Sequence, residues 1–503
     1  MSVFPTSVSP ASLPGGEDHQ CAVDWIAAGA KRLFIGGKWV AAQSGRTFES
    51  ISPVTEECLA IVAEADVPDV DAAVIAARQA FEDSAWSRMN PHVRSRALLK
   101  IADAIERHAG ELAVLESLDV GMPIWYSTAS VAAAVQVFHY YAGWPTKMFG
   151  TTNPTDPTTF IYTLREPLGV CGQINPWNAP FIMASIKIAT ALSCGNTVLL
   201  KPAEQAPLST LRLAELIQST ELPAGVVNII PGFGPTAGAA IAAHPAIDKV
   251  AFTGSTVVGK QILAASVGNL KKVTLELGGK SPNIIFPDAD VEKALQSAVK
   301  SFCGNSGQVC SAGTRLFVHE SLHEEVSDRV TRLAATYKVG LPFETDTKLG
   351  PLISGKQLDR VMGYIESGKR AGASLRLGGS RVSEKGYFVE PTVFSGVANS
   401  MSIAQEEIFG PVLSIIPFRD EHDAVFQAND TQYGLAAAVW TRDNARAHTV
   451  ARRLKAGRVW INTYGEADPV MAFGGYKQSG IGREYGAESI DAYTQSKAVM
   501  MRL

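Results

Sequence analysis

The sequence predicts an α/β protein with two doubly wound α/β domains and an extended β arm. The chain has 503 residues, of which 46% are hydrophobic and 19% charged, a globular composition too long for one simple core. Two separate stretches alternate short apolar runs with helical runs, which is typical of parallel sheets covered by helices. A polar, threonine- and proline-rich stretch at residues 145–165 predicts a linker or an arm that packs on another subunit.

The N-terminal part is expected to be mostly helical. Residues 1–20 are rich in serine, proline and glycine and lack the basic and then apolar order of a signal peptide, so we expect a disordered tail and a cytoplasmic protein. Residues 32–40 predict a hairpin with a Gly-Gly turn. Helical spacing of apolar residues then predicts helices at residues 69–81, 93–118 and 131–141.

The first alternation runs from residue 169 to residue 265. Its expected strands and helices are, in turn, residues 169–174, 181–192, 197–200, 206–220, 226–230, 236–243, 249–252 and 256–265. The stretch at residues 181–194 is too short to span a membrane and carries Lys187, so we expect a core helix. Ligands of such sheets bind at the carboxyl ends of the strands, so each loop that leaves a strand is a candidate site.

Three of these loops carry suggestive residues: Pro176-Trp177-Asn178, Lys201-Pro202-Ala203-Glu204 and Thr253-Gly254-Ser255-Thr256. In the third loop, the free backbone N–H groups and the dipole of the helix that follows are suited to binding a phosphate. The G-x-G-x-x-G fingerprint is absent from the chain, and a tight turn with a Ser or Thr N-cap explains this loop at least as well.

The second alternation predicts another α/β domain. Its expected elements are the strand 282–286, the helix 291–302, the strand 315–318, the helix 324–337 and the strand-like runs 387–394, 410–418, 434–441 and 458–462. Residues 492–503 predict an edge strand. Together with residues 160–162, this strand is the candidate for subunit pairing.

Charge and cysteine content exclude several classes of partner. The net charge is only −4, so the sequence predicts no binding to nucleic acid or to an anionic membrane, and its partners are expected to be small molecules or copies of itself. Six cysteines lack paired spacing, and no C-x-x-C or H-E-x-x-H motif occurs. We therefore expect reduced thiols and no metal site.

Cys310 lies between a glycine-rich turn and the apolar run at residues 316–318. Taken alone, it is more typical of a small buried hydrophobic residue than of a nucleophile. A catalytic thiolate also requires an oxyanion donor, a base and an acceptor for the electrons or the acyl group.

Seven motifs follow one another along the chain: Pro176-Trp177-Asn178, Lys201-Pro202-Ala203-Glu204, Phe252-Thr253-Gly254-Ser255, Leu275-Glu276-Leu277-Gly278-Gly279-Lys280, Gly307-Gln308-Val309-Cys310, Glu406-Glu407-Ile408-Phe409-Gly410-Pro411 and Phe473-Gly474-Gly475-Tyr476-Lys477. In this order they resemble the NAD(P)-dependent aldehyde dehydrogenase superfamily, from Phe34 to Tyr493. The resemblance implies a Rossmann-like NAD-binding domain (residues 21–144 and 168–277), a catalytic domain (278–487) and an oligomerisation arm (145–167 and 488–503) in a homodimer or homotetramer.

The resemblance also implies the catalytic roles. Cys310 would attack the aldehyde, and the Asn178 amide and the Cys310 N–H would hold the oxyanion; an Asx turn is the alternative for Asn178. Glu276 would activate water to release the acid from a thioester, since relatives that pass the acyl group to coenzyme A generally lack this glutamate. The local sequence pattern alone predicts instead that Glu276 is a surface charge on a half-buried strand.

The residues that the resemblance assigns to the cofactor are Ile174, Pro176, Trp177, Lys201, Glu204, Gly254, Ser255, Glu407 and Phe409. A carboxylate near the ribose 2′ position accepts hydrogen bonds from a hydroxyl and repels a phosphate, so Glu204 favours NAD over NADP. Val257 departs from the acidic residue that many relatives carry there.

The resemblance also implies an aldehyde tunnel, and the residues that it assigns to the lining are mostly small here: Ala133, Ala179, Met183, Ile186, Gly304, Val309, Ala467 and Phe473. A wide apolar tunnel predicts a bulky hydrophobic aldehyde, aromatic or terpenoid-like. Neighbouring side chains could fill this space instead, which would favour an aliphatic aldehyde, and Glu466 and Asp468 could receive a cationic aminoaldehyde. A cysteine esterase and a catalytically silent binding protein are the alternatives of another class.

Overall fold

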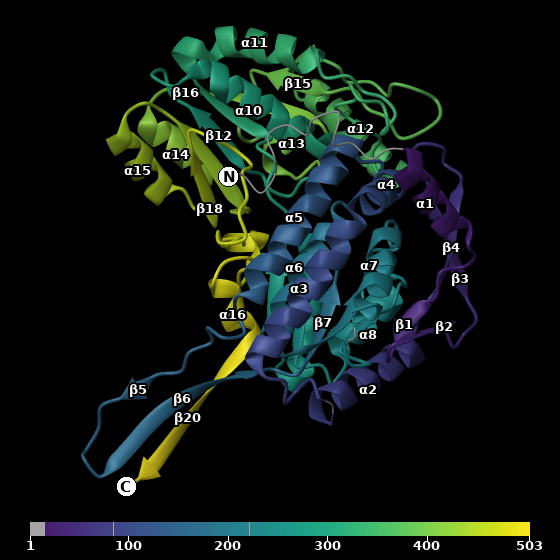
Figure 1. Ribbon diagram of the computed structural model, residues 1–503. Coiled ribbons are helices and arrows are strands. Elements are labelled where there is room, and N and C mark those ends of the chain that lie inside the picture. Colours follow the sequence, from purple (N-terminus) through teal and green to yellow (C-terminus); the bar gives the residue numbers. More distant parts are fainter. Residues whose placement is uncertain (1–15, 84, 221) are drawn as a thin grey trace.

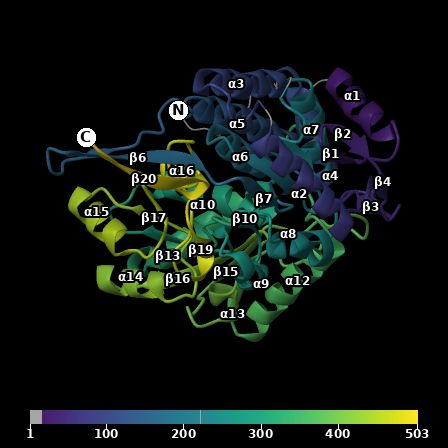
Figure 2. The same ribbon diagram turned by 90° about the horizontal axis from the view of Figure 1, so that it is seen from below.

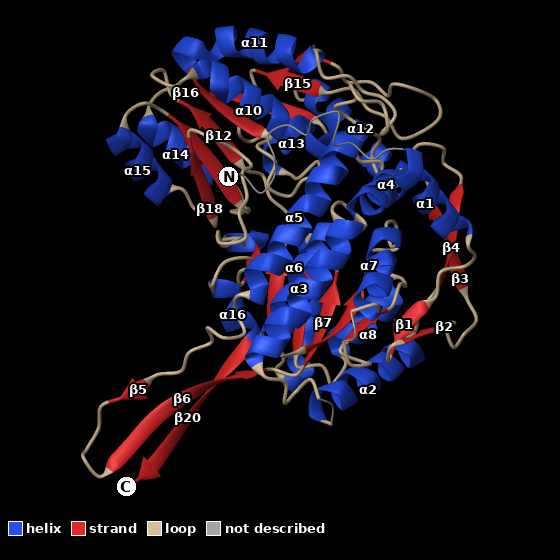
Figure 3. Ribbon diagram, viewed as in Figure 1, coloured by secondary structure: helices blue, strands red, loops and turns tan. Residues whose placement is uncertain are grey.

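The computed structural model describes residues 16–83, 85–220 and 222–503. They form two α/β bodies, one above the other in Figure 1, and a narrow β ribbon that projects from the lower body. Each body contains one large sheet covered by helices, as the colouring in Figure 3 shows.

The lower body holds an eight-stranded sheet in the order β19-β11-β10-β7-β8-β9-β1-β2. The strands from β11 to β9 run parallel, whereas β1, β2 and β19 pair antiparallel. Every residue of β7, β8 and β10 is buried, which explains their continuous apolar runs. The bounds are β1 (Leu33–Ile35), β2 (Lys38–Val40), β7 (Val170–Ile174), β8 (Thr197–Lys201), β9 (Val227–Ile229), β10 (Lys249–Thr253), β11 (Lys272–Glu276) and β19 (Gly480–Ile481).

The helices of this body are α1 (Gly16–Ala27), α2 (Val67–Glu82), α3 (Pro91–Arg107), α4 (Ala109–Val120), α5 (Ile124–Ala142), α6 (Pro180–Ser193), α7 (Leu208–Gln218), α8 (Ala239–Ala243) and α9 (Thr256–Ala265). The helix expected at residues 93–118 is two helices, because His108 leaves helical geometry (φ −112°, ψ 18°). The helix expected at residues 236–243 begins as a π-helical turn, Gly234–Gly238.

The prediction of a disordered tail is wrong for residues 16–20, which belong to α1. Two acidic residues in the first turn favour a helix start there. The helix is anchored at its other end, where the Trp25 indole donates to Glu215 (2.8 Å) and the Lys31 ammonium lies 3.9 Å from the indole centre. The remainder of the expected tail, residues 1–15, lies outside the described residues.

The upper body holds a seven-stranded sheet in the order β14-β15-β16-β13-β12-β17-β18, in which only β14 is antiparallel to its neighbour. The strand expected at residues 387–394 is divided: Val389 forms an isolated antiparallel bridge with Arg381, and the strand of the large sheet begins at Thr392, after Pro391, which lacks the N–H that a central ladder needs. The strands are β12 (Pro282–Ile285), β13 (Arg315–His319), β14 (Ser374–Leu377), β15 (Thr392–Ser395), β16 (Val412–Phe418), β17 (Ala436–Trp440) and β18 (Arg458–Ile461). The helices are α10 (Val291–Cys303), α11 (His323–Ala335), α12 (Gly355–Arg370), α13 (Ser402–Gln405), α14 (Glu421–Asn429) and α15 (Asn444–Arg453).

The ribbon joins segments that are far apart in sequence. β20 (Thr494–Arg502) pairs antiparallel with β6 (Thr159–Pro167) along its whole length, and β6 also pairs with β5 (Thr152–Asn153). Figure 2 shows the ribbon leaving the body beside α16 (Glu488–Tyr493). A separate hairpin, β3 (Thr47–Ile51) and β4 (Cys58–Ala63), completes the strands. Within the described ranges, no helix is long and apolar enough to cross a bilayer.

Candidate active site

The predicted site residues gather where the two sheets face each other. Asn178, Glu204, Ser255 and Glu276 lie at or just beyond the carboxyl ends of strands in the lower sheet. Cys310 lies before β13, so the upper sheet contributes from the amino ends of its strands. A site between the bodies can therefore take cofactor groups from one sheet and the nucleophile from the other.

The Cys310 loop is held in a strained conformation. Asn305, Ser306 and Gly307 have φ values of 47°, 55° and 74°, a left-handed region that asparagine and glycine tolerate and that serine disfavours. The hydroxyl of Ser306 donates to the Gly350 carbonyl (2.7 Å), and the Gln308 side chain accepts from the Ile353 N–H (2.9 Å). These bonds to a neighbouring segment offset the strain and fix the position of the nucleophile.

Asn178 is joined to this loop from the opposite body. Its side-chain amide donates to the Gln308 carbonyl (2.8 Å), and its own carbonyl accepts from the Asn305 amide (2.8 Å). An amide group has two N–H bonds, so one remains to donate to an oxyanion. The predicted neighbourhood of Asn178 and the Cys310 loop is therefore present, and an Asx turn does not account for the contact.

The Cys310 side chain carries a free thiol and is partly exposed. Burial within the pocket, together with Glu407 and Glu276, raises the pKa of its thiol to about 12. Both carboxyl groups, when ionised, therefore oppose loss of the thiol proton.

Glu276 ends β11 and is only 2% exposed, so the local interpretation as a surface charge is wrong. Among the described residues, neither of its carboxyl oxygens has a hydrogen-bond partner. Burial and the nearby Glu484 raise its pKa well above the ordinary value. A Cβ on Gly474 would lie 2.8 Å from one carboxyl oxygen, so this glycine leaves the space that the carboxyl group occupies.

Two charged residues beside Glu276 were not predicted. Lys187 forms a buried ion pair with Glu484 and donates to the Thr253 hydroxyl (2.8 Å). The positive charge of Lys187 opposes the rise in the Glu276 pKa. A single lysine in a long apolar helix was the available signal for a buried charge site, but nothing in the sequence indicated its partner.

The lower sheet offers a set of groups that fits NAD. Lys201 is the last residue of β8 and is buried. Its ammonium group lies 3.2 Å from the carboxylate of Glu204, and this pair suits the recognition of ribose hydroxyls. Ser255 caps α9 by accepting from the Val258 N–H (3.3 Å), at an exposed helix N-terminus that suits a pyrophosphate. A Cβ on Gly254 would lie 2.5 Å from the Phe252 ring, so the turn requires glycine.

Three more residues of the predicted cofactor set, Trp177, Phe409 and Glu407, make specific contacts. The rings of Trp177 and Phe409 meet edge to face, with centroids 5.2 Å apart. Glu407 accepts from the Gly279 N–H (3.0 Å), and burial raises its pKa to about 7. Ile174 and Pro176, also assigned to this set, are buried.

The residues expected to line the tunnel fall into a buried group and a partly exposed group. Ala133 and Ile186 are buried in the core cluster of α5 and α6. The others keep partial exposure: Ala179, Met183, Gly304, Val309, Ala467 and Phe473. Tyr126, which was not predicted, faces Gly304, because a Cβ on this glycine would lie 3.7 Å from the tyrosine ring.

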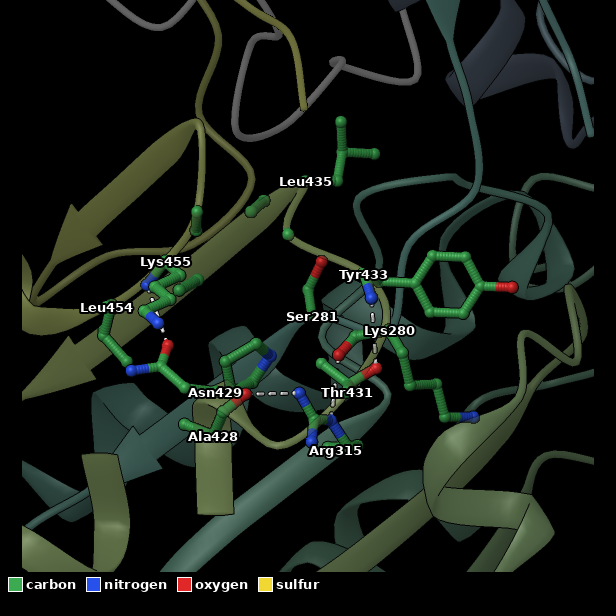
Figure 4. A pocket seen from close by; sticks show the side chains of 15 residues that line it. Lys280, Ser281, Arg315, Ala428, Asn429, Thr431, Tyr433, Leu435, Leu454 and Lys455 are labelled. Atoms are coloured by element: carbon green, nitrogen blue, oxygen red, sulfur yellow. Dashed lines mark hydrogen bonds between the residues drawn. The ribbon is translucent and has the colours of Figure 1, made fainter. Parts of the chain in front are cut away.

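A small cavity of about 10 Å³, room for roughly one water molecule, lies at the amino ends of β12, β13 and β17. Figure 4 shows the Arg315 guanidinium facing Ala428 and Asn429, while the Lys280 side chain points away from Lys455. Arg315 donates to the carbonyls of Ala428 (2.8 Å) and Lys280 (2.8 Å), which is a structural role.

The model of the aldehyde dehydrogenase family matches residues 39–499. The chain is 50% identical to an aldehyde dehydrogenase from Bacillus cereus solved as an NAD+ complex, with a TM-score of 0.94 over 96% of this chain and 98% of that one. It is 48% identical to human retinal dehydrogenase 2, over 94% of this chain and 92% of the relative. It is 43% identical to an indole-3-acetaldehyde dehydrogenase from P. syringae, with a TM-score of 0.93 over 94% and 96% of the two chains. The agreement extends over nearly the whole chain, and this protein therefore belongs to the aldehyde dehydrogenase family.

Proposed function

We propose that this protein oxidises an aldehyde to the carboxylic acid with NAD as the electron acceptor. The observation that carries the proposal is the hydrogen bond from the Asn178 amide to the Gln308 carbonyl, two residues before Cys310. This contact supports the proposal because it joins a non-titrating donor to the loop that carries the thiol, and the burial of Glu276 supports its assignment as the base that such a reaction requires.

In the first half of the reaction, the Cys310 sulfur loses its proton to solvent and forms a bond to the aldehyde carbon. The carbonyl oxygen becomes an oxyanion, which accepts hydrogen bonds from the Asn178 amide and the Cys310 N–H. Each such donor is worth about 3–4 kcal/mol of barrier. Bound NAD supplies the two-electron acceptor for the oxidation that leaves a thioester on Cys310.

In the second half, Glu276 removes a proton from water as the water oxygen attacks the thioester carbon. The carbon–sulfur bond then breaks, the acid leaves, and the Cys310 sulfur regains a proton. The raised pKa of Glu276 supports this role, because a stronger base accepts the proton of water more readily. Glu204 supports NAD over NADP, because its carboxylate accepts from a 2′-hydroxyl and repels a 2′-phosphate.

We further propose a bulky hydrophobic substrate, aromatic or terpenoid-like. The small side chains of Ala179, Gly304 and Ala467 support this choice, and two relatives are named for retinal and indole-3-acetaldehyde. An aliphatic aldehyde or an aminoaldehyde is the alternative, the latter because Glu466 and Asp468 follow Tyr464 in the same loop. We also propose a homodimer or homotetramer that forms through the ribbon.

The test is NADH formation, followed by absorbance, with NAD and a panel of acetaldehyde, hexanal, cinnamaldehyde and citral. Wild-type protein and the matched control Cys21→Ser, which removes an exposed thiol, are expected to produce NADH. Cys310→Ala is expected to lose at least about a thousandfold in rate. Turnover by Cys310→Ala would refute the mechanism. A preference for acetaldehyde over cinnamaldehyde and citral in kcat/KM would refute the bulky-substrate assignment alone.

A further inference from the structure

Arg458 is a buried cation at the amino end of β18, only 4% exposed. Its guanidinium donates to two successive carbonyl groups, those of Met471 and Ala472 (3.1 Å to the latter). Its central carbon lies 4.8 Å from the centre of the Phe473 ring, within the range of a cation–π interaction. One side chain therefore fixes both the backbone before Phe473 and the ring itself.

The segment that Arg458 holds continues to the base. Phe473 and Glu484 exchange two backbone hydrogen bonds of 2.7 Å each. The next residue, Gly474, lies against Glu276, and a Cβ on Gly457, the neighbour of Arg458, would lie 1.6 Å from the Gly474 carbonyl oxygen. The start of β18, the ring of Phe473 and the carboxyl group of Glu276 thus form one packed unit.

Arg458 also contributes charge to this unit. The ionisable groups that act on Glu276 are Glu484, Lys187, Arg483 and Arg458, and Arg458 favours the ionised carboxylate. The influence is mutual, since burial lowers the pKa of Arg458 while Glu276 and Cys310 oppose that fall. A planar guanidinium presents its N–H donors in a fixed fork and can stack its flat face on a ring, a geometry that the compact ammonium group of lysine does not reproduce.

We propose that Arg458 is a positioning residue for aldehyde selectivity, which holds the Phe473 ring against the substrate and supplies a positive charge beside Glu276. The proposal rests on the aldehyde oxidation proposed above. A ring held in one orientation discriminates by the shape of the aldehyde, so losing the guanidinium should affect flat, bulky aldehydes more than acetaldehyde.

The test compares Arg458→Met and Arg458→Lys with the wild type. Arg315→Lys is the matched control, because Arg315 is also a buried arginine at the start of a strand, donates to carbonyls, and lies 5.2 Å from a phenylalanine ring. The cinnamaldehyde-to-acetaldehyde ratio of kcat/KM is expected to fall about tenfold in both Arg458 variants, the scale of one cation–π contact. It should stay within about twofold in Arg315→Lys.

The pH profile of kcat provides the second readout. Removal of the positive charge raises the pH at which Glu276 ionises, so the acidic limb should move to higher pH in Arg458→Met and stay in place in Arg458→Lys, which keeps the charge. An unchanged aldehyde ratio in folded Arg458 variants, an equal fall in Arg315→Lys, or an unmoved limb in Arg458→Met would each overturn the proposal. Absence of NADH formation by the wild type with every aldehyde would instead refute the proposed function, and this inference with it.

Discussion

Glu276 occupies an environment that stabilises its neutral form, although its proposed role requires the ionised form. Its carboxyl group is buried, lies near Glu484, and has no hydrogen-bond partner among the described residues. A raised folded-state pKa means that its contribution to stability is fully present below the pKa of the unfolded chain and is lost as pH rises toward the folded value. The site therefore loses stability at the pH where the base becomes active.

Glu276→Gln should separate these two effects. We expect one equivalent of NADH per active site in rapid mixing and then a stall, because the thioester forms but is not hydrolysed. Thermal unfolding near neutral pH should show a gain of about 1–3 kcal/mol, since a neutral amide avoids the cost of ionising a buried group. The gain should shrink as the pH falls toward about 4, where the unfolded glutamate also becomes protonated.

The control for this prediction is Glu106→Gln, an exposed glutamate on α3, which should retain steady-state turnover. Continued NADH formation by Glu276→Gln beyond the first equivalent would contradict the assignment of the base.

At the scale of elements, α4 contacts the starts of the two helices that follow the Asn178 loop and the Glu204 loop. Glu116 accepts from the Phe181 N–H (3.3 Å) at the start of α6, which follows Asn178. Asp119 accepts from the Leu208 N–H (2.8 Å) at the start of α7, which follows Glu204. Burial raises the pKa of Glu116 to about 8 and that of Asp119 to about 7. One helix thus sets the position of two site loops by capping the helices that follow them.

Asp119→Ala should weaken NAD binding. It leaves the Leu208 N–H without its acceptor, at a cost of about 1 kcal/mol, and KM for NAD should rise about fivefold. Asp119→Asn keeps one oxygen for that N–H, and its amide can donate to the Ser50 hydroxyl, so we expect it to restore most of the affinity.

The matched control is Asp420→Ala, which removes the cap of α14 in the upper body. It should lower Tm by a similar amount and leave KM for NAD unchanged. An equal rise in KM in both alanine variants would indicate a general loss of stability instead of a local effect of α4.

At the scale of the whole molecule, the ribbon is the feature on which the proposed oligomer depends. β20 is an edge strand of a narrow sheet that projects away from both bodies (Figure 1). Its apolar side chains Met500 and Met501 are 71% and 50% exposed, and Phe160 on β6 is 41% exposed. Exposed strand edges with apolar side chains favour pairing with another chain.

Replacement of both methionines by aspartate should therefore weaken the association of chains into the proposed oligomer. Charges at these positions would have to be desolvated in an interface, so we expect a smaller mass by light scattering. The control is Phe426→Asp, which changes a 64% exposed apolar residue on α14. An unchanged mass for the double variant would exclude these side chains from the interface.

The local sequence pattern predicted most helices and strands, and it failed where tertiary contacts determine the bounds of an element. The buried strands of the lower sheet were predictable because continuous apolar runs bounded by turns have few alternatives. The break at His108 was not predictable, because it lies within an unbroken helical periodicity. The helix that begins at Gly16 was not predictable either, because it depends on the contact of Trp25 with α7. The neighbourhood of Asn178 and the Cys310 loop was expected only from the order of seven motifs.

The sequence by itself determined the α/β class, the two alternating stretches, the family resemblance and the identity of the expected nucleophile, oxyanion donor and base. Each of these depends on residue type and order along the chain. Only the tertiary structure decided that Glu276 is buried beside Glu484 and Lys187, that Arg458 contacts Phe473, and that α4 caps two helices of the site. Such contacts join residues that are between 15 and 297 positions apart, and their charges and hydrogen bonds acquire their effect only when folding removes them from water.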